Sequence, residues 1–488
     1  MPVTFYNTIS RKKNPLIPIN SNHINIYVCG ITAYDYCHIG HARSTLVFDM
    51  IVRYLRFREY DVTYVRNFTD IDDKIIKRAQ EQNTTTEELA NRFIDAFHED
   101  MLSLGNIKPS LEPKATEHIA EMIALIEDLI AKDFAYEVDG DVYFRVDKFS
   151  EYGKLSGRNL EDMMAGARIT INENKHNPMD FALWKKSKPG EPVWDSPWGD
   201  GRPGWHIECS AMSKKYFGDT FDIHGGGKDL IFPHHENEIA QSEAASHKTF
   251  VQNWIHHGFV TIKDEKMSKS LNNFLTIREI LEKYSAEVLR FFTFSTHYRS
   301  PIDYSDNAMQ DAETGLDRLY SCLAEIQKLP SEGQSDKHTV AGKKNITKIQ
   351  TIEDRFTAAM DNDFNSAQAI GHIFDVVKSL NTIKQSLPPA PSQSDLDLLH
   401  KGAEDIKKLA TSMGLLQQDA VQYIQDKQQK VLEQLDIDIS AINVLIEKRN
   451  QARNDKDWAK ADEIRDTLLG MQIEIKDDAK GTSWQVKV

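Results

Sequence analysis

The stretch Cys29-Gly-Ile-Thr-Ala-Tyr-Asp-Tyr-Cys-His-Ile-Gly-His41 determines how the chain is organised. An apolar run at residues 24–28 precedes it, and an amphipathic segment at residues 46–55 follows it. This order predicts a strand, a turn and a helix, an arrangement that points backbone N–H groups at an anion. The turn also places Cys29, a potential metal ligand, close to a possible phosphate site that begins at His38.

The bulk composition indicates a multidomain protein of ordinary type. A chain of 488 residues is too long for one core, so we expect two to four domains. The 40% hydrophobic and 27% charged content argues against a disordered or fibrous chain. The net charge of −15 argues mildly against a surface coated in basic residues, although it does not exclude a local basic track.

The sequence also predicts a location. The first residues show no charged segment followed by an apolar one, so we expect no signal peptide. No uncharged run is long enough to cross a bilayer, and we therefore expect no membrane association. Four cysteines in a chain of this size do not form a disulfide framework, which favours the reducing cytoplasm.

An α/β pattern continues through the first part of the chain. Residues 61–68 form a second expected strand, and a helix is expected from Thr85, which stands in capping-box spacing with Glu88. This order predicts a parallel, doubly wound sheet that binds ligands at the carboxyl ends of its strands. Residues 115–200 interrupt the pattern with one helix, a hairpin around Asp139-Gly140 and irregular chain rich in Trp, Pro and Gly, so we interpret them as an insertion.

The second half of the chain changes from α/β to helical. The α/β character returns at Gly204, and beyond Tyr284 the pattern is helical. From about Asp436 we expect a small separate domain with helices at residues 442–453 and 458–469 and short strands at residues 472–476 and 483–487. The sequence thus predicts an α/β domain with an insertion, a helical region and a small mixed C-terminal domain.

Four residues far apart in the sequence form a candidate metal site: Cys29, Cys209, His234 and Glu238. His234 and Glu238 are four residues apart on one expected helix and share a face. We expect each cysteine to end a strand, so that parallel strands bring both thiols to one edge of the sheet. Two thiolates, one imidazole and one carboxylate suit Zn²⁺. By spacing alone the alternative stays open, because a lone cysteine at a strand end is more often a small buried hydrophobe.

A second candidate site would bind a nucleotide. In His38-Ile-Gly40-His41, at a helix N-terminus, two imidazoles add to the helix dipole, and the glycine permits close approach of the backbone to phosphates. The loop Lys266-Met-Ser-Lys269-Ser places two ammonium groups where they could close over a leaving pyrophosphate. Each motif alone would be compatible with an incidental turn or a solvated loop. The chain has no P-loop motif.

Together, these motifs resemble the class I aminoacyl-tRNA synthetases, and within them the cysteinyl-tRNA synthetases. The segments that carry the closer resemblance are Cys29-Gly-Ile-Thr32, Asn67-Phe-Thr-Asp-Ile-Asp-Asp-Lys74, Gly204-Trp-His-Ile-Glu-Cys-Ser-Ala-Met212 and Asp222-Ile-His-Gly-Gly-Gly-Lys-Asp-Leu-Ile-Phe-Pro-His-His-Glu-Asn-Glu238. The resemblance extends along essentially the whole chain.

The resemblance implies an architecture. A Rossmann-type catalytic domain of residues 1–114 and 201–262 would be split by a connective insertion of residues 115–200. Residues 263–315 would carry the Lys266–Ser270 loop and a stem-contact region. A helical bundle that binds tRNA would span residues 316–430, and an anticodon-binding domain would span residues 431–488.

The resemblance also implies roles for individual residues. In the family, zinc ligands occupy the positions of Cys29, Cys209, His234 and Glu238. The residues implied to bind ATP are His38, Gly40, His41, Gly226, Gly227, Asp229 and Lys269, with His38, His41, Lys266 and Lys269 acting in catalysis. The residues implied to hold cysteine are Gly30, Thr32, Thr69 and Trp205. Trp458 and Asp462 are the candidates for anticodon contacts, although Trp458 could equally pack at a helix start.

The implied activity is that of a cysteine–tRNA ligase acting as a monomer. Cysteine would be activated by ATP with Mg²⁺ and transferred to the 3′ end of tRNA(Cys), with one Zn²⁺ per chain reading the substrate thiolate. One alternative is an ATP-dependent cysteine ligase acting on a small amine, which should lack the C-terminal domain. The other is a zinc-stabilised RNA-binding protein without catalysis, which would not need the two ATP motifs.

Overall fold

The computed structural model describes residues 2–159, 175–262, 265–266, 274–333, 340–434, 439–471, 473–478 and 481–486. The chain divides into two compact units. The first contains Met1–Thr314, Thr347–Val376 and Glu404–Leu415, and the second contains Gly315–Ile346, Val377–Ala403 and Leu416–Val488.

A four-stranded parallel sheet forms the centre of the first unit. Its strands are β3 (His23–Thr32), β4 (Asp61–Thr69), β9 (Phe221–Gly227) and β10 (Val251–His257), in the order β10-β9-β3-β4. The parallel α/β expectation is therefore confirmed. The chain extends the sheet in one direction from β3 to β4 and in the other from β9 to β10. The strand order thus reverses between β3 and β9, which is where parallel α/β sheets bind ligands.

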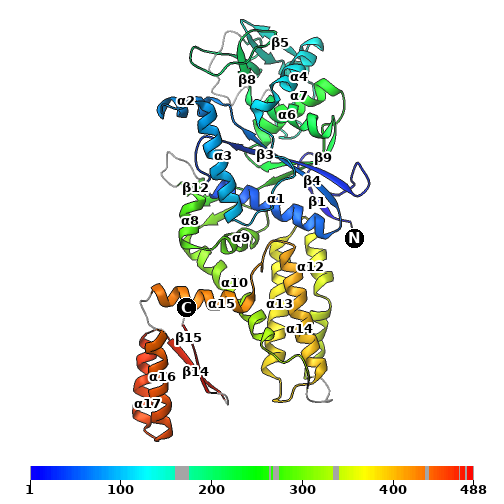
Figure 1. Ribbon diagram of the computed structural model, residues 1–488. Helices are drawn as coiled ribbons and strands as arrows, with labels where there is room; N and C mark the ends of the chain where they lie inside the picture. Colours follow the sequence, from blue (N-terminus) through cyan, green and yellow to red (C-terminus); the bar gives the residue numbers. More distant parts are fainter. Residues whose placement is uncertain are drawn as a thin grey trace. The chain divides into compact units, whose positions relative to one another are not determined.

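Helices cover both faces of this sheet. In Figure 1, α1 (Ile39–Phe57) lies below the strands, and α6 (Trp205–Phe217) and α7 (Glu236–Ser246) lie above them. A short π-helical turn, η3 (Ile231–His235), leads into α7. The helices α2 (Asp73–Glu81) and α3 (Thr86–Ser103) follow β4. The predicted capping box is confirmed, because Thr85 and Glu88 exchange hydrogen bonds at the start of α3.

The expected insertion folds as a helix and an antiparallel sheet between β4 and β9. It contains η1 (Ala115–His118), α4 (Ile119–Ala131) and η2 (Val146–Lys148), together with β5 (Ala135–Val138), β6 (Asp141–Phe144) and β7 (Phe181–Lys186). Strand β8 (Gly201–Pro203), directly after the expected boundary at residue 200, completes the antiparallel sheet. The hairpin expected at Asp139-Gly140 is confirmed as the turn between β5 and β6. Buried Trp184 of β7 and Trp254 of β10 belong to one core, so the insertion is packed against the parallel sheet.

The expectation that Cys209 ends a strand is wrong. Strand β8 ends at Pro203, and Cys209 lies in the middle of α6. The strand was expected because the α/β character of the sequence returns at Gly204. In fact α6 is buried over most of its circumference from Ile207 to Ser213, so its sequence shows no one-sided apolar stripe.

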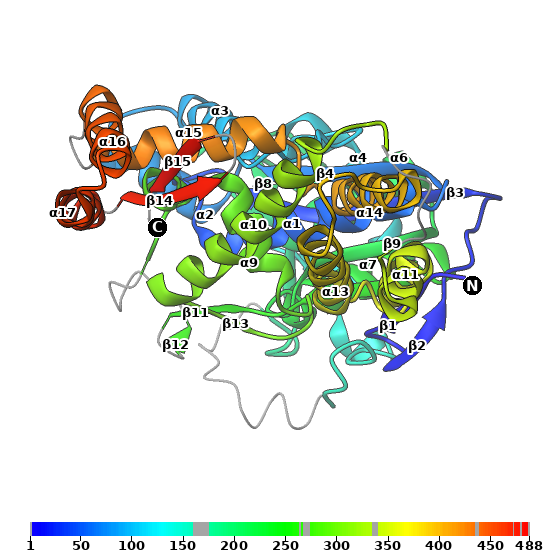
Figure 2. The same ribbon diagram turned by 90° about the horizontal axis from the view of Figure 1, so that it is seen from below.

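Small sheets and helices complete the first unit. An N-terminal hairpin, β1 (Thr4–Asn7) and β2 (Lys12–Pro15), lies beside β10. After β10 come β11 (Val260–Ile262), β12 (Glu265–Lys266), α8 (Ile277–Lys283), α9 (Ala286–Phe294) and β13 (Ile302–Tyr304). Strand β11 pairs with both β12 and β13. Phe292 of α9 packs on Tyr304 of β13, and Figure 2 shows α9 beside this sheet.

The rest of the chain is mostly helical, as expected. Its helices are α10 (Asp306–Gln327), α11 (Lys343–Gln350), α12 (Ile352–Met360), α13 (Ser366–Gln385), α14 (Gln393–Thr411) and α15 (Ala420–Gln434). Among the described residues, no helix is both long enough and apolar enough to cross a membrane.

The C-terminal segment has the expected mixed composition. It contains α16 (Ile439–Asn454), α17 (Trp458–Gly470) and the antiparallel strands β14 (Ile473–Asp478) and β15 (Gly481–Val486). Ile442, Ile446 and Leu468 belong to its small core. Buried Arg449 donates two hydrogen bonds to the carboxylate of Asp477, at 2.9 and 2.7 Å, and so joins α16 to β14.

Candidate functional site

The four predicted metal ligands lie together at the carboxyl edge of the parallel sheet. Cys29 comes from β3, Cys209 from α6, His234 from η3 and Glu238 from α7. One donor atom from each lies within 4.8 Å of the donor atoms of the other three. Cys209, His234 and Glu238 are buried, and Cys29 is partly buried. Residues that span more than 200 positions in the sequence thus form one compact donor set.

The geometry of this set fits a tetrahedral zinc ion. Zinc–sulfur bonds of about 2.3 Å at a tetrahedral angle place two sulfurs roughly 3.8 Å apart. The Sγ atoms of Cys29 and Cys209 are 3.7 Å apart. Glu238 Oε1 lies 3.0 Å from His234 Nε2 and 3.6 Å from Cys29 Sγ. Two sulfurs, a nitrogen and an oxygen at these separations could hold one such ion.

The electrostatics of the pocket also favour a cation. Burial and the neighbouring Cys209 raise the pKa of the Cys29 thiol, whereas the hydrogen bond from Cys29 lowers the pKa of Cys209. Burial opposes ionisation of Glu238, but His224 and His234 outweigh it and hold the pKa of this carboxyl well below its usual range. Cys209 and Glu238 thus have pKa shifts in the direction expected of groups that carry a negative charge.

Additional imidazoles surround the donor set, and their roles were not predicted. His224 Nε2 donates to Glu238 Oε2 at 2.8 Å. His206 Nδ1 lies 3.0 Å from Nδ1 of His234, which leaves Nε2 of His234 facing the other donors. His235 Nε2 lies 3.3 Å from Cys29 Sγ. Partners of this kind fix the orientation of metal ligands.

These imidazoles also make a second possible donor set with Cys29 and Glu238, formed by His224 and His235. In both sets the imidazole nitrogens lie within hydrogen-bonding distance of another donor of the same set, so hydrogen bonding does not separate them. The set with two thiols offers the softer donors, which suit Zn²⁺ better. The high number of histidines between residues 206 and 257 was the sequence signal that imidazoles surround the donor set.

The His38–His41 motif begins α1, as predicted. His38 is the N-cap, and its Nδ1 accepts a hydrogen bond from Gly40 N at 3.0 Å. His41 Nδ1 accepts from His38 N at 3.2 Å, and the two rings stack with centroids 3.9 Å apart. A neutral imidazole that accepts at Nδ1 carries its proton on Nε2. Both rings therefore have the tautomer that donates to an anion at a helix N-terminus.

A cavity of about 460 Å³ joins the metal donors to this motif. It lies at the reversal of strand order between β3 and β9. The predicted site residues that line it are Cys29, Gly30, Thr32, His38, Gly40, His41, Trp205, Gly227 and Asp229. The ring of Trp205 stacks on His234 with centroids 4.2 Å apart, so the wall of the cavity continues into the metal donor set.

At two positions of the site, Gly30 and Gly226, a larger residue would clash with its neighbours. A Cβ on Gly30 would lie 1.5 Å from the carbonyl oxygen of Asn67 on the neighbouring strand, so no other residue fits there. A Cβ on Gly226 would lie 2.9 Å from both His235 Cε1 and Leu230 Cδ1. Gly226 does not line the cavity and instead makes room for the imidazole ring behind it.

Other predicted residues lie away from the cavity or outside the described residues. Thr69 is buried, and its hydroxyl donates to Glu208 Oε2 at 2.5 Å. Lys266 belongs to β12, but its side chain and the whole of Lys269 lie outside what the structure describes. Trp458, at the start of α17, is 60% exposed, and Asp462 is exposed one turn later on the same helix.

Three basic residues that were not predicted also line the cavity: Arg43, Lys74 and His257. Arg43 is fully buried in α1, and its Nη2 donates to the carbonyls of Tyr298 and Ser300 at 3.0 and 2.7 Å. An arginine on the buried face of an amphipathic helix was the available sequence signal. No sequence pattern around Lys74 or His257 indicated that either residue lines the cavity.

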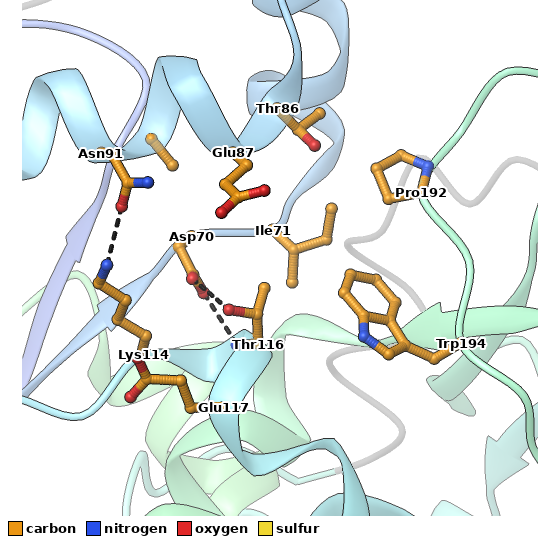
Figure 3. Close-up of a pocket in the computed structure, with 11 residues that line it drawn as sticks. Asp70, Ile71, Thr86, Glu87, Asn91, Lys114, Thr116, Glu117, Pro192 and Trp194 are labelled. Atoms are coloured by element: carbon orange, nitrogen blue, oxygen red, sulfur yellow. Dashed lines mark hydrogen bonds between the residues drawn. The ribbon is translucent and has the colours of Figure 1, made fainter.

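A second cavity, of about 410 Å³, lies between the end of β4, α3 and the insertion. Figure 3 shows Asp70 bonded to Thr116 and Lys114 bonded to Asn91 across its wall, with Trp194 on the insertion side. Among the predicted site residues that the structure describes, none lines this cavity. The substrate site is therefore better placed in the cavity beside Cys29.

Comparison with known proteins identifies the class of the chain. Residues 15–314 match the family model for the class I (C) tRNA synthetase catalytic domain, residues 355–417 match a DALR domain, and residues 440–484 match a cysteinyl-tRNA ligase anticodon binding domain. The fold and its site are thus those of a class I aminoacyl-tRNA synthetase. Methionyl-tRNA synthetase of Mycobacterium tuberculosis in complex with methionyl-adenylate has a similar fold, with a TM-score of 0.61 and 18% identity over 86% of this chain and 94% of that chain.

Curated relatives narrow the assignment. The cysteine–tRNA ligase of Desulfotalea psychrophila is 61% identical over 486 residues, covering 100% of this chain and 99% of the relative. That of Geobacter sulfurreducens is 54% identical over 490 residues and covers both chains completely. The chain belongs to the cysteine–tRNA ligase family.

Proposed function

We propose that this protein activates L-cysteine with ATP and transfers it to the 3′ end of tRNA(Cys). The observation that carries the proposal is the convergence of Cys29, Cys209, His234 and Glu238 at one end of a cavity whose other end holds His38 and His41. An amino acid whose side chain is held at the donor set has its carboxylate directed along the cavity toward the phosphate motif. The proposed reaction takes place between these two ends, where the cysteine carboxylate would meet the α-phosphate of ATP.

Selection of cysteine would occur at the donor set. Cysteine and serine differ by one atom, which a pocket that measures size discriminates poorly. A zinc ion held by the four residues would bind a thiolate and lower its pKa, an advantage that the serine hydroxyl cannot match. Trp205 and Thr32 line the same end of the cavity, and we propose that they and Gly30 hold the rest of the amino acid. Thr69 was also expected to hold the substrate cysteine. Its hydroxyl bonds to Glu208, so we propose that Thr69 acts only indirectly, through that residue.

ATP would occupy the other end of the cavity. In the activation step the cysteine carboxylate attacks the α-phosphorus, and pyrophosphate leaves. The Nε2–H groups of His38 and His41 would donate to phosphate oxygens as charge develops, next to the N–H groups that begin α1. Gly227, the last residue of β9, and Asp229, which follows it, line the cavity and would lie along the adenosine, with Gly226 supporting the same strand end.

The ammonium groups of Lys266 and Lys269, together with Mg²⁺, would neutralise the departing pyrophosphate. In the second step a terminal ribose hydroxyl of the tRNA attacks the activated carbonyl, and AMP leaves. Both steps depend mainly on positioning and charge stabilisation. All the proposed groups come from one chain, so a monomer would suffice.

The C-terminal domain separates this proposal from a ligase acting on a small amine. Its sequence matches an anticodon-binding model, which a small-molecule ligase would not need. Trp458 is exposed at the start of α17, and an exposed indole suits stacking on an unpaired base. We propose that Trp458 and Asp462, one turn apart, contact the anticodon loop.

Cysteine-dependent ATP–pyrophosphate exchange tests the proposal. The zinc-loaded protein should exchange label with cysteine, should exchange far less with serine, and should lose the cysteine reaction when zinc is removed by a chelator. An absence of exchange with cysteine in the zinc-loaded protein would refute the proposal. Transfer of labelled cysteine to tRNA(Cys), but not to a small amine, would distinguish the two ligases.

A further inference from the structure

A hydrogen-bonded chain runs from the metal donor set to the N-terminal hairpin. Cys29 Sγ lies 3.3 Å from His235 Nε2, and His235 Nδ1 lies 2.8 Å from His256 Nε2. His256 Nδ1 in turn lies 2.7 Å from the hydroxyl Oγ1 of Thr8. Both imidazoles are buried, at 0% and 3% exposure, so each ring has its two nitrogens committed to this chain.

For two neutral imidazoles, the protons of this chain have only one consistent order when Cys29 is a thiolate. A metal-bound thiolate accepts hydrogen bonds and donates none, so His235 must donate from Nε2 and accept at Nδ1. His256 must then donate from Nε2 and accept at Nδ1. The only proton that can satisfy that last acceptor within the chain is the Thr8 hydroxyl.

Thr8 is well placed to end such a chain. Its backbone N–H donates to the carbonyl of Trp254 at 3.0 Å, and the amide of Asn7 bonds to Gln252 O at 2.9 Å. Trp254 N donates in return to Asn7 Oδ1 at 3.0 Å. These bonds hold the segment after β1 against β10, the strand that carries His256. The position of the Thr8 hydroxyl is therefore set by backbone bonds and not by the histidine alone.

We propose that Thr8 is a positioning residue of the metal site, which acts through His256 and His235 to hold Cys29 as a hydrogen-bond acceptor. Without the hydroxyl, His256 Nδ1 is a buried acceptor with no donor, and nothing fixes the ring on that side. The ring would then be free to turn, and the hydrogen bonds from His256 to His235 and from His235 to the thiolate would be misaligned. The inference rests on the proposed metal site. It adds a residue of the N-terminal hairpin to those that determine the affinity of that site for zinc.

The substitution Thr8→Val tests the proposal, because valine has nearly the same shape and no hydroxyl. It should weaken zinc binding about 10-fold, at the lower end of the effects of outer-shell partners. In cobalt-substituted protein it should shift the thiolate-to-metal charge-transfer band, because the sulfur loses a hydrogen bond. Thr8→Ser keeps a hydroxyl, so its zinc affinity and its charge-transfer band should both match those of wild type.

A matched control is available on the same hairpin. The hydroxyl of Thr4 donates to the carbonyl of Asp361 and has no link to the histidines, so Thr4→Val makes the same chemical change away from the metal site. Zinc affinity would be measured by competition with a chromophoric chelator on full-length, zinc-loaded protein. Weaker binding and a shifted band in Thr8→Val alone would support the proposal.

Two results would overturn it. If Thr8→Val matches wild type in both readouts, the hydroxyl has no role at the metal. If Thr4→Val weakens zinc binding as much as Thr8→Val, the effect belongs to the stability of the hairpin. A wild-type protein that holds no zinc would instead refute the proposed metal site itself, which keeps the two failures distinct.

Discussion

Replacing Cys209 with serine gives a quantitative test of the metal site. The side chain is 2% exposed, its Sγ lies 3.7 Å from that of Cys29, and it supplies one of four donors. Structural zinc sites contribute about 10–16 kcal/mol in total, so one donor of four is worth roughly 2.5–4 kcal/mol. At 1.36 kcal/mol for each factor of ten, Cys209→Ser should weaken zinc binding by roughly 100- to 1,000-fold.

The assay pairs zinc affinity with substrate kinetics. Chelator competition gives the zinc affinity, and pyrophosphate exchange gives KM for cysteine, which should rise while KM for ATP stays nearly constant. Cys322→Ser is the control, because Cys322 is an equally buried thiol in α10, outside the donor set. If Cys209→Ser retains zinc as tightly as Cys322→Ser, Cys209 is not a ligand and the donor set has been misassigned.

Three other predictions concern separate parts of the chain. Inserting two glycines between Cys29 and His38 should lower kcat of pyrophosphate exchange while zinc content and ATP affinity persist, because the turn sets the distance between the two ends of the cavity; an unchanged kcat would contradict this. Lys269→Ala should lower the exchange rate by about 10²–10³-fold, the typical cost of losing one charge-stabilising donor, with zinc content unchanged. The paired arginine depresses the pKa of Asp477, so its contribution to stability is complete above the usual carboxyl pKa near 3.8 and is lost as pH falls below it. The protection of β14 amides from exchange, measured relative to their intrinsic exchange rate at each pH, should therefore decrease below pH 4 in wild type, and Arg449→Met should show much less of this pH dependence.

The sequence predicted the fold well where local signals agreed with the tertiary structure. Strands β3 and β4 are apolar runs that end in polar residues, and the capping box at Thr85 marks a helix start. Cys209 was misplaced because a helix buried on nearly all sides has no polar face, so its sequence lacks the 3.6-residue period. That error did not affect the metal prediction, because a helix that starts at the sheet edge reaches the same place.

The surroundings of the site were harder to predict. The bond from Thr69 to Glu208 joins residues 139 positions apart, and no local pattern could have indicated it. The same holds for His206 beside His234 and for Arg43 beneath the cavity. Such partners are decided by how elements pack, whereas Cys29, His38 and His41 are close in sequence and retain their spacing in the fold.

The pairing of β3 with β9 has a consequence for the order of events during synthesis. The two strands meet at Ile26 and Ile223, so the centre of the sheet closes only after about 200 further residues have been made. At roughly 5–20 residues per second this takes on the order of 10–40 s, during which β3 can pair only with β4. The Cys29 thiol is made early and waits for Glu238, the last of its three co-ligands. A metal held by all four residues would therefore act only after β9 and the start of α7 have been made, and not in the first folding step.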